Sequence, residues 1–195
     1  KLRFSAKKTM MLAQQLYEGI ELEAGEPVGL ITYMRTDSTR ISKEAAEEAI
    51  QLIQERFGPA YSLKKPRFFK NKKKVQDAHE AIRPTSVYNT PEKVKRFLSQ
   101  DQLGLYRLIW NRFVASQMKE ALIDTNSITI KAGSYLFTTA GSTIKFPGFM
   151  ALYMSVDDEI ANESEKKKGV LPALVEGTIL KLNKLEPKQH FTLPP

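Results

Sequence analysis

A tyrosine and an arginine stand two positions apart early in the chain, at Tyr33 and Arg35. Because strand side chains alternate between faces, a strand through both residues points the phenol and the guanidinium at one site. A guanidinium suits a phosphate, whereas a phenol with a pKa of about 10 needs a nearby cation or base to become a nucleophile. Asp37 follows in a predicted turn, where it orients Arg35 or caps the turn. Tyr33 with Arg35 therefore makes physical sense as a nucleophile beside a phosphate holder. On spacing alone, however, a tyrosine at a strand end more often packs and an arginine two residues on is more often solvated.

A second polar cluster holds one of the two histidines of the chain, in Ala78-His79-Glu80-Ala81-Ile82-Arg83-Pro84-Thr85. If this segment is a helical turn, His79 and Arg83 share a face and Pro84 ends the turn. A zinc pair of the His-Glu-x-x-His kind is not formed, because the fifth position is Arg83. A histidine beside an arginine suits phosphate binding or proton transfer. The alternative is a surface loop in which His79 has no role.

A basic run lies between these two motifs, at residues 64–74. It carries seven basic residues, no acidic residue and two aromatic residues, Phe68 and Phe69. Lysines supply phosphate contacts and aromatic rings stack on unpaired bases. A charge run by itself is more often a solvated loop, but its place between the two motifs points toward a nucleic-acid partner. The sequence contains no Gly-x-x-x-x-Gly-Lys loop and no paired-carboxylate cluster, so we expect neither ATP nor a metal ion to bind this chain.

The composition excludes several classes of protein. The 195 residues carry a formal charge of +8 and no cysteine, which excludes a disulfide framework and thiolate zinc sites and fits a reducing, cytoplasmic location. No apolar stretch is long enough to span a bilayer, so we expect no membrane partner. The basic surplus points to a polyanion.

The elements that position the motifs are predicted to be mainly helical up to about residue 118. Serine and threonine caps followed by apolar stripes predict helices over residues 5–19 and 42–58, one beginning at Thr90, and one from Ser99 or Asp101 to Met118. Residues 28–33 read as a short, largely buried strand that leads into the tyrosine motif.

Beyond Asp124 the pattern changes to short β-like segments broken by glycines, among them Gly133 and Gly141, with a last segment at residues 179–182. We therefore expect an α+β chain of two parts, residues 1–120 and 121–195. The chain starts without a methionine and ends at Pro194-Pro195, and we expect it to be an excised piece of a larger protein.

The motifs resemble those of a known family. Residues 29–39, Gly-Leu-Ile-Thr-Tyr-Met-Arg-Thr-Asp-Ser-Thr, closely resemble the active-site segment of the type IA DNA topoisomerases, specifically the bacterial DNA topoisomerases I. Residues 78–85 resemble the second motif of that family at a compatible distance, and residues 7–18 and 187–195 are also similar to family segments. The resemblance covers almost the whole chain.

The resemblance implies a chemistry for each motif residue. Tyr33 is then the nucleophile, which attacks a phosphodiester of single-stranded DNA, forms a 5′-phosphotyrosine link and leaves a free 3′-hydroxyl that later reverses the reaction. Arg35 would stabilise charge on the phosphate, and His79 would help to position the strand. Asp37 would orient its neighbours, and Arg83 would contact the DNA backbone or support the structure. Negatively supercoiled DNA is thereby relaxed one strand at a time without ATP.

The resemblance also implies an architecture, a torus in which the tyrosine-bearing domain lifts away to open a gate. Residues 1–120 would be that mobile, mainly helical domain, and residues 121–195 one portion of a β-rich arch. The Mg²⁺-binding, acidic Toprim domain of the family would lie before Lys1, so we expect Mg²⁺ to be held there and this chain alone to be inactive. The expected partners are single-stranded DNA and the remaining domains of the same enzyme, and the isolated chain is open to self-association.

Two other functions fit the sequence less well. A non-enzymatic, basic nucleic-acid-binding module would use Tyr33 for packing alone. A tyrosine recombinase would carry its tyrosine near the C-terminus, behind several arginines and histidines, whereas Tyr33 lies near the start of a chain with two histidines.

Overall fold

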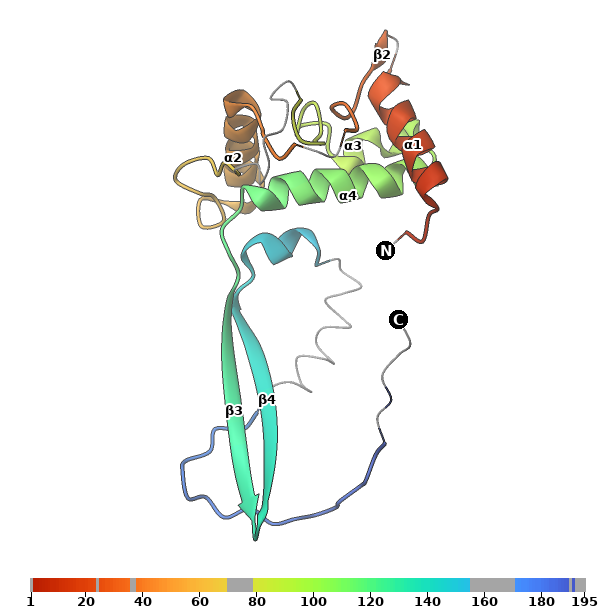
Figure 1. The fold of residues 1–195 in the computed structure, drawn as a ribbon. Helices are drawn as coiled ribbons and strands as arrows, with labels where there is room; N and C mark the ends of the chain where they lie inside the picture. The colour runs from red at the N-terminus through yellow and green to blue at the C-terminus, as the bar shows by residue number, and fades with distance from the viewer. Residues whose placement is uncertain are drawn as a thin grey trace.

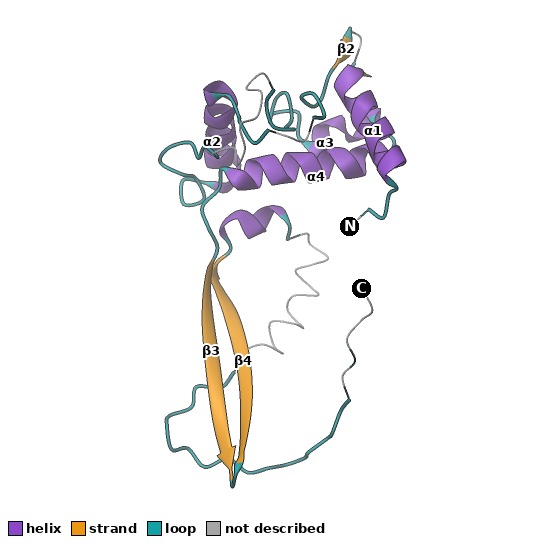
Figure 2. Ribbon diagram, viewed as in Figure 1, coloured by secondary structure: helices purple, strands orange, loops and turns teal. Residues whose placement is uncertain are grey.

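The computed structural model describes residues 2–23, 25–35, 38–69, 79–154, 171–189 and 191. Helices gather at one end of the molecule, and a long two-stranded hairpin extends away from them (Figure 1). Helices and small antiparallel sheets together confirm the α+β class (Figure 2). Asp37 and residues 70–74 of the basic run lie outside the described residues.

Helices α1 (Ala6–Glu18) and α2 (Lys43–Phe57) have the predicted ends. The hydroxyl oxygen of Ser5 accepts a hydrogen bond from Lys8 N at the start of α1, and Ser42 caps α2 in the same way. Each helix ends at a glycine with positive φ. One stripe of each helix is buried, so both pack their apolar faces into a common core.

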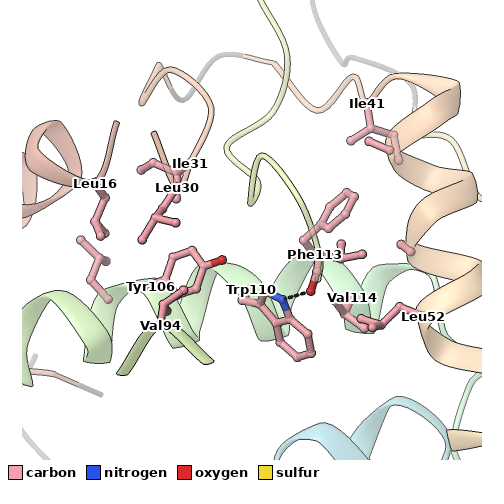
Figure 3. Packing of buried hydrophobic residues seen from close by; sticks show 14 of the residues in the cluster. Leu16, Leu30, Ile31, Ile41, Leu52, Val94, Tyr106, Trp110, Phe113 and Val114 are labelled. Atoms are coloured by element: carbon pink, nitrogen blue, oxygen red, sulfur yellow. Dashed lines mark hydrogen bonds between the residues drawn. The ribbon is translucent and has the colours of Figure 1, made fainter. Parts of the chain in front are cut away.

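Helix α4 (Gln100–Ser116) is the central core helix, as predicted, and it begins with a capping box formed by Ser99 and Gln102. In Figure 1, α1 and α2 stand at opposite ends of α4. Trp110 is buried at the middle of the core, where its Nε1 donates to the Val87 carbonyl at 2.9 Å (Figure 3). The helix predicted at Thr90 is short, α3 (Pro91–Val94), and continues as the 3₁₀ helix η1 (Lys95–Phe97).

The strand predicted over residues 28–33 is only partly regular. Strand β1 (Ile20–Glu21) pairs with β2 (Pro27–Val28), and the extended chain beyond Val28 forms a single bridge, from Ile31 to Pro84. Leu30 and Ile31 are buried as expected. The ladder ends because the neighbours in space are not strands. One neighbour is the end of α1 and the other is the irregular segment that contains Arg83.

The β-rich part differs from the prediction. Strands β3 (Leu122–Ala132) and β4 (Tyr135–Phe146) form one long antiparallel hairpin with Gly133 in its turn. Gly141 does not break β4, because it pairs in register with Asn126. Residues 179–182 are not a strand, since no neighbouring strand pairs with them among the described residues.

The root of the hairpin is fixed to the helical end. Lys119 N donates to the Tyr61 carbonyl and Phe149 N donates to the Lys119 carbonyl, both at 2.9 Å. The 3₁₀ helix η2 (Gly148–Leu152) then packs against α4. A Cβ on Gly148 would lie 2.4 Å from the Glu120 carbonyl oxygen, so only glycine fits there. The predicted domain boundary near residue 120 falls at this root, and the division into two domains stays a prediction.

Candidate active site

The two sequence motifs lie side by side although about 50 residues separate them. Backbone hydrogen bonds join them in both directions, from Thr32 N to the Arg83 carbonyl at 2.9 Å and from Thr85 N to the Leu30 carbonyl at 3.1 Å. The Thr85 hydroxyl adds a bond to the Gly29 carbonyl at 2.7 Å. The tyrosine segment and the histidine segment therefore form one structural unit.

Thr32 strengthens this unit through its side chain. Its hydroxyl donates to the Ala81 carbonyl at 2.7 Å and accepts from Arg83 N at 3.0 Å. A single hydroxyl thus serves two backbone groups of the other motif, directly before Tyr33 in the chain.

Helix α1 holds the other edge of the tyrosine segment. Leu30 N donates to the Leu16 carbonyl at 2.7 Å, in the last turn of the helix. A Cβ built on Gly29 would lie 2.6 Å from the carbonyl oxygen of Tyr17. The absence of a side chain at Gly29 therefore permits the close approach of helix and segment.

The ring of Tyr33 contacts two other rings. Tyr17 meets it edge-on, with ring centroids 5.3 Å apart and planes at 65°, and His79 tilts against it at 5.8 Å and 38°. Such offset and edge-to-face arrangements are the favoured ones for aromatic pairs. Tyr33 is still 48% exposed, so its ring is oriented by its neighbours and reachable by a large substrate.

His79 carries a buried nitrogen without a partner. Its Nδ1 is fully covered and makes no hydrogen bond with the described residues. Buried polar nitrogens are nearly always bonded in folded proteins, so an exception is a marker of function. The ring contact with Tyr33 holds the imidazole in place, but the described residues supply no hydrogen bond to this nitrogen.

Arg35 lies two residues beyond Tyr33, and both side chains are exposed while Met34 between them is half-buried. This alternation agrees with the predicted sharing of one face. Arg35 also takes part in an interaction within the chain. The predicted neighbour Asp37 lies outside the described residues, so its orienting role stays a prediction.

Arg83 is occupied by contacts within its own motif. Its Nε and terminal nitrogen donate to Glu80 at 2.9 and 2.6 Å, and its other terminal nitrogen donates to the Pro84 carbonyl at 2.9 Å. The side chain is only 12% exposed. These contacts are those of structural support, and the predicted contact of Arg83 with DNA stays a prediction.

The expected helical turn at residues 79–83 is not formed. Bonds to Thr32 and Leu30 draw this segment out along the tyrosine segment, and Ala81 N donates to the Arg40 carbonyl at 2.7 Å. Long-range pairing therefore outweighs the local i, i+4 pattern of His79 and Arg83. His79 reaches Tyr33 through this extended geometry.

The described residues do not suit a bound metal ion, since no three of their histidine and acidic side chains come together. The expectation that Mg²⁺ is held outside this chain stays a prediction. No helix within the described ranges is both long and apolar enough to cross a bilayer.

Comparison with known proteins decides the family. A family model described as DNA topoisomerase matches residues 1–195. The chain belongs to the bacterial, type IA family of DNA topoisomerases. It is similar to a solved structure of full-length topoisomerase I from Thermotoga maritima, with 44% sequence identity and a TM-score of 0.68. The match covers 80% of this chain and 24% of the Thermotoga maritima chain, so this topoisomerase chain spans about a quarter of that relative.

Two further residues of this topoisomerase chain enter the site, Tyr17 and Gly29. The sequence analysis placed Tyr17 only in the first helix and Gly29 only in the quoted motif. No spacing rule links a helix end to a segment twelve residues later across an acidic loop. The only signal in the sequence was the family likeness of residues 7–18, which pointed to the helix as a whole.

Proposed function

We propose that this chain carries the nucleophile of a type IA DNA topoisomerase, which cleaves and rejoins one strand of DNA at a time. The observation that supports the proposal best is the Tyr33 ring, exposed and yet oriented by Tyr17 and His79. The phenolic end of an exposed ring can meet a phosphodiester, and ring contacts on its neighbours limit the directions in which it points. The membership of the chain in the topoisomerase family supplies DNA as the substrate.

In the proposed reaction the Tyr33 Oη attacks the phosphorus of a phosphodiester. A bond from the phenolic oxygen to phosphorus forms, the bond from phosphorus to the 3′-oxygen breaks, and that oxygen leaves as a 3′-hydroxyl after taking a proton. The 3′-hydroxyl later attacks the 5′-phosphotyrosine and restores both groups. One phosphodiester replaces another at each step, so no ATP is consumed.

The neighbouring residues have distinct proposed roles. Arg35, exposed two residues beyond Tyr33, would stabilise the negative charge that develops on the phosphate. His79, whose ring lies against that of Tyr33, would bind the strand or carry a proton beside the nucleophile. Arg83 would hold the histidine segment in place through Glu80. Bound Mg²⁺, held outside this chain, would position the DNA phosphates.

The remaining expectations follow from the family architecture. We propose that the helical end is the mobile domain of a torus and that the hairpin belongs to its arch. Apolar side chains along the hairpin are exposed, including Leu122, Tyr135 and Leu136. Two strands alone seldom form a stable sheet, so other domains of the same enzyme would cover them. The isolated chain would then not cleave DNA, and these exposed side chains are where it would self-associate.

The test uses the full-length protein with Tyr33→Phe, and Tyr135→Phe as the matched control on the exposed hairpin. Tyr33→Phe is expected to abolish relaxation of negatively supercoiled DNA and to leave no covalent protein–DNA adduct after denaturation. Binding of a single-stranded oligonucleotide should change little, and Tyr135→Phe should behave as the parent protein. Relaxation by the Tyr33→Phe protein would instead contradict the assignment of Tyr33 as the nucleophile and leave it a packing role alone.

A further inference from the structure

A large open hollow lies beside the site, between the second half of α4, the η2 helix and residues 67–69. Its volume is about 800 Å³. The walls combine two arginines with several aromatic rings, chiefly Arg67, Arg112, Phe69, Phe149 and Tyr153. Ala81 and Ile82 of the histidine motif and Thr39 of the tyrosine motif also line it, so the hollow adjoins both motifs.

The chemistry of these walls matches one kind of ligand. Aromatic rings stack on the faces of unpaired bases, and guanidinium groups bind phosphate and also stack. An apolar ligand would leave the two arginines without a partner for their charge, and an anion without a ring would not stack on the aromatic side chains. A nucleotide uses both.

The charges at the hollow are unequally occupied. Arg67 donates to Glu120 at 2.8 Å through one terminal nitrogen. Arg112 is exposed and forms no ion pair with any residue of the described ranges. Within the described part of the chain, Arg112 therefore offers a positive charge that no acidic side chain neutralises, and Arg67 offers one that Glu120 partly neutralises.

The loop that forms one wall is held in place by a buried glutamine. The Gln117 side chain is fully buried, and its amide accepts from Arg67 N at 2.9 Å and donates to the Arg67 carbonyl at 3.0 Å. It thus pairs with the Arg67 backbone as a neighbouring strand would. Ser62 and Met118 form a bridge close by. A wall fixed before binding lowers the entropic cost of binding a flexible strand.

We propose that this hollow binds an unpaired nucleotide of single-stranded DNA, as a second contact beside the Tyr33 site. The ring of Phe69 stacks on the base, and Arg112 binds a phosphate of the same strand. The inference rests on the proposed function for its substrate. It goes beyond that function in assigning a DNA contact to residues outside both motifs.

The first experiment is photo-crosslinking to the full-length protein with Tyr33→Phe, which holds DNA without cleaving it. The probes are thymidine oligonucleotides that carry a single 5-iodouracil at successive positions. At one position the crosslinked peptide is expected to contain Phe69, Phe149 or Tyr153. Crosslinks at every position that miss these peptides would overturn the inference.

The second experiment measures affinity by fluorescence anisotropy in the same background, with a neighbouring residue as control for each variant. Phe69→Leu is expected to weaken binding roughly fivefold or more, because a stacking platform is lost. Phe68→Leu removes a neighbouring ring that is at least as exposed but does not line the hollow, and should leave the affinity within about twofold. Equal losses for both variants would contradict the inference.

The arginines give a matched pair on one helix. Log affinity falls as log salt rises, and Arg112→Gln should make this slope shallower by about 0.7, as expected for one lost phosphate contact with a single strand. Arg107→Gln removes the same charge from an exposed position of α4 outside the hollow, and should lower the slope much less. Equal slopes for the Arg112→Gln and Arg107→Gln proteins would mean that only the total charge of the protein matters, and would contradict the inference. Thermal unfolding of each variant identifies any that fail to fold. For those positions, the crosslinks to the Tyr33→Phe protein without a further substitution decide whether DNA reaches the hollow.

The two proposals fail in different ways. If Tyr33→Phe leaves cleavage intact, the proposed function is wrong, whatever the crosslinks show. If Tyr33→Phe abolishes cleavage while the crosslinks and the variants miss the hollow, the proposed function stands and this inference is wrong.

Discussion

The ring of Tyr17 meets the ring of Tyr33 edge-on, with their centroids 5.3 Å apart. The first residue belongs to the last turn of α1, and the second is the proposed nucleophile on a segment bonded to that turn. Tyr17 is itself 42% exposed, so its position owes little to burial in the core. The contact orients the Tyr33 ring from a helix that lies outside both of the motifs around Tyr33 and His79.

Replacing Tyr17 should therefore slow cleavage without removing it. Tyr17→Leu deletes the edge-on ring and is expected to lower the single-turnover cleavage rate roughly two- to tenfold, the size of one aromatic pair interaction. Tyr17→Phe keeps the ring and should restore the parent rate. The measurement is adduct formation at saturating DNA, with DNA affinity and thermal midpoint followed in parallel. A loss of rate that tracks the thermal midpoint, or that Phe fails to rescue, would assign Tyr17 to stability alone.

The close approach of Gly29 to the Tyr17 carbonyl gives a second prediction. Gly29→Ala places a Cβ at 2.6 Å from that oxygen, so helix and segment must separate. We expect a loss of about 1–3 kcal/mol in the free energy of unfolding. Urea titration followed by the fluorescence of Trp110, the only tryptophan, reports it.

Gly25→Ala is the matched control for this substitution. A Cβ at Gly25 meets nothing within 4 Å, and its φ is not positive, so the stability should stay within about 0.5 kcal/mol. If Gly29→Ala lowered the free energy of unfolding as little as Gly25→Ala does, the close contact at Gly29 would be relieved at little cost and the prediction would be wrong.

The hydroxyl of Thr32 gives a third prediction, on the link between the two motifs. Thr32→Val keeps the shape of the side chain but removes the bonds to Ala81 and Arg83. The backbone groups left without a partner should lower the stability by about 1–3 kcal/mol. Thr9→Val removes a bond on the exposed face of α1 and should cost less than about 0.5 kcal/mol. Unfolding by urea distinguishes the two, and similar losses would show that the Thr32 bonds are not special.

The core tyrosine Tyr106 predicts a dependence on pH. Burial raises the pKa of Tyr106 above its ordinary value, while the unfolded chain ionises this phenol near pH 10. Above that pH the folded state holds a proton that the unfolded state has lost, so stability falls as the pH rises. Tyr106→Phe should flatten the decline above about pH 10, at the cost of the bond to the Asn89 carbonyl at neutral pH. A decline as steep as that of the parent protein would contradict this assignment.

Local signals predicted the helices well. The caps at Ser5, Ser42 and Ser99 and the stop at Gly19 act through atoms a few residues away, and each lies where the sequence placed it. The hairpin was harder to predict, because Gly141 reads as a strand break when its partner Asn126 is unknown. Pairing partners are long-range information, and one sequence does not contain them in a readable form.

The same limit applies to the candidate site. The motifs around Tyr33 and His79 were found from their residues and from a family resemblance, and the structure brings their rings together. The extended path of residues 79–83 was missed, because an i, i+4 spacing of His79 and Arg83 suggested a helical turn. The Thr32 hydroxyl bonds to Ala81 and Arg83 and so fixes the middle and the end of that path, and nothing near His79 in the sequence indicates these bonds.

The fixed root of the hairpin has a mechanical consequence. Gly148 packs against Glu120 and Lys119 bonds to Tyr61, so the hairpin is attached to the helical end at its root and extends from there. The 11 residues of β3 reach about 37 Å at ~3.4 Å per residue. A tilt of roughly 10° at the root then sweeps the tip through ~6 Å. A small rotation at the root of the hairpin would therefore be amplified along its length into a displacement at the tip on the scale of a nucleotide.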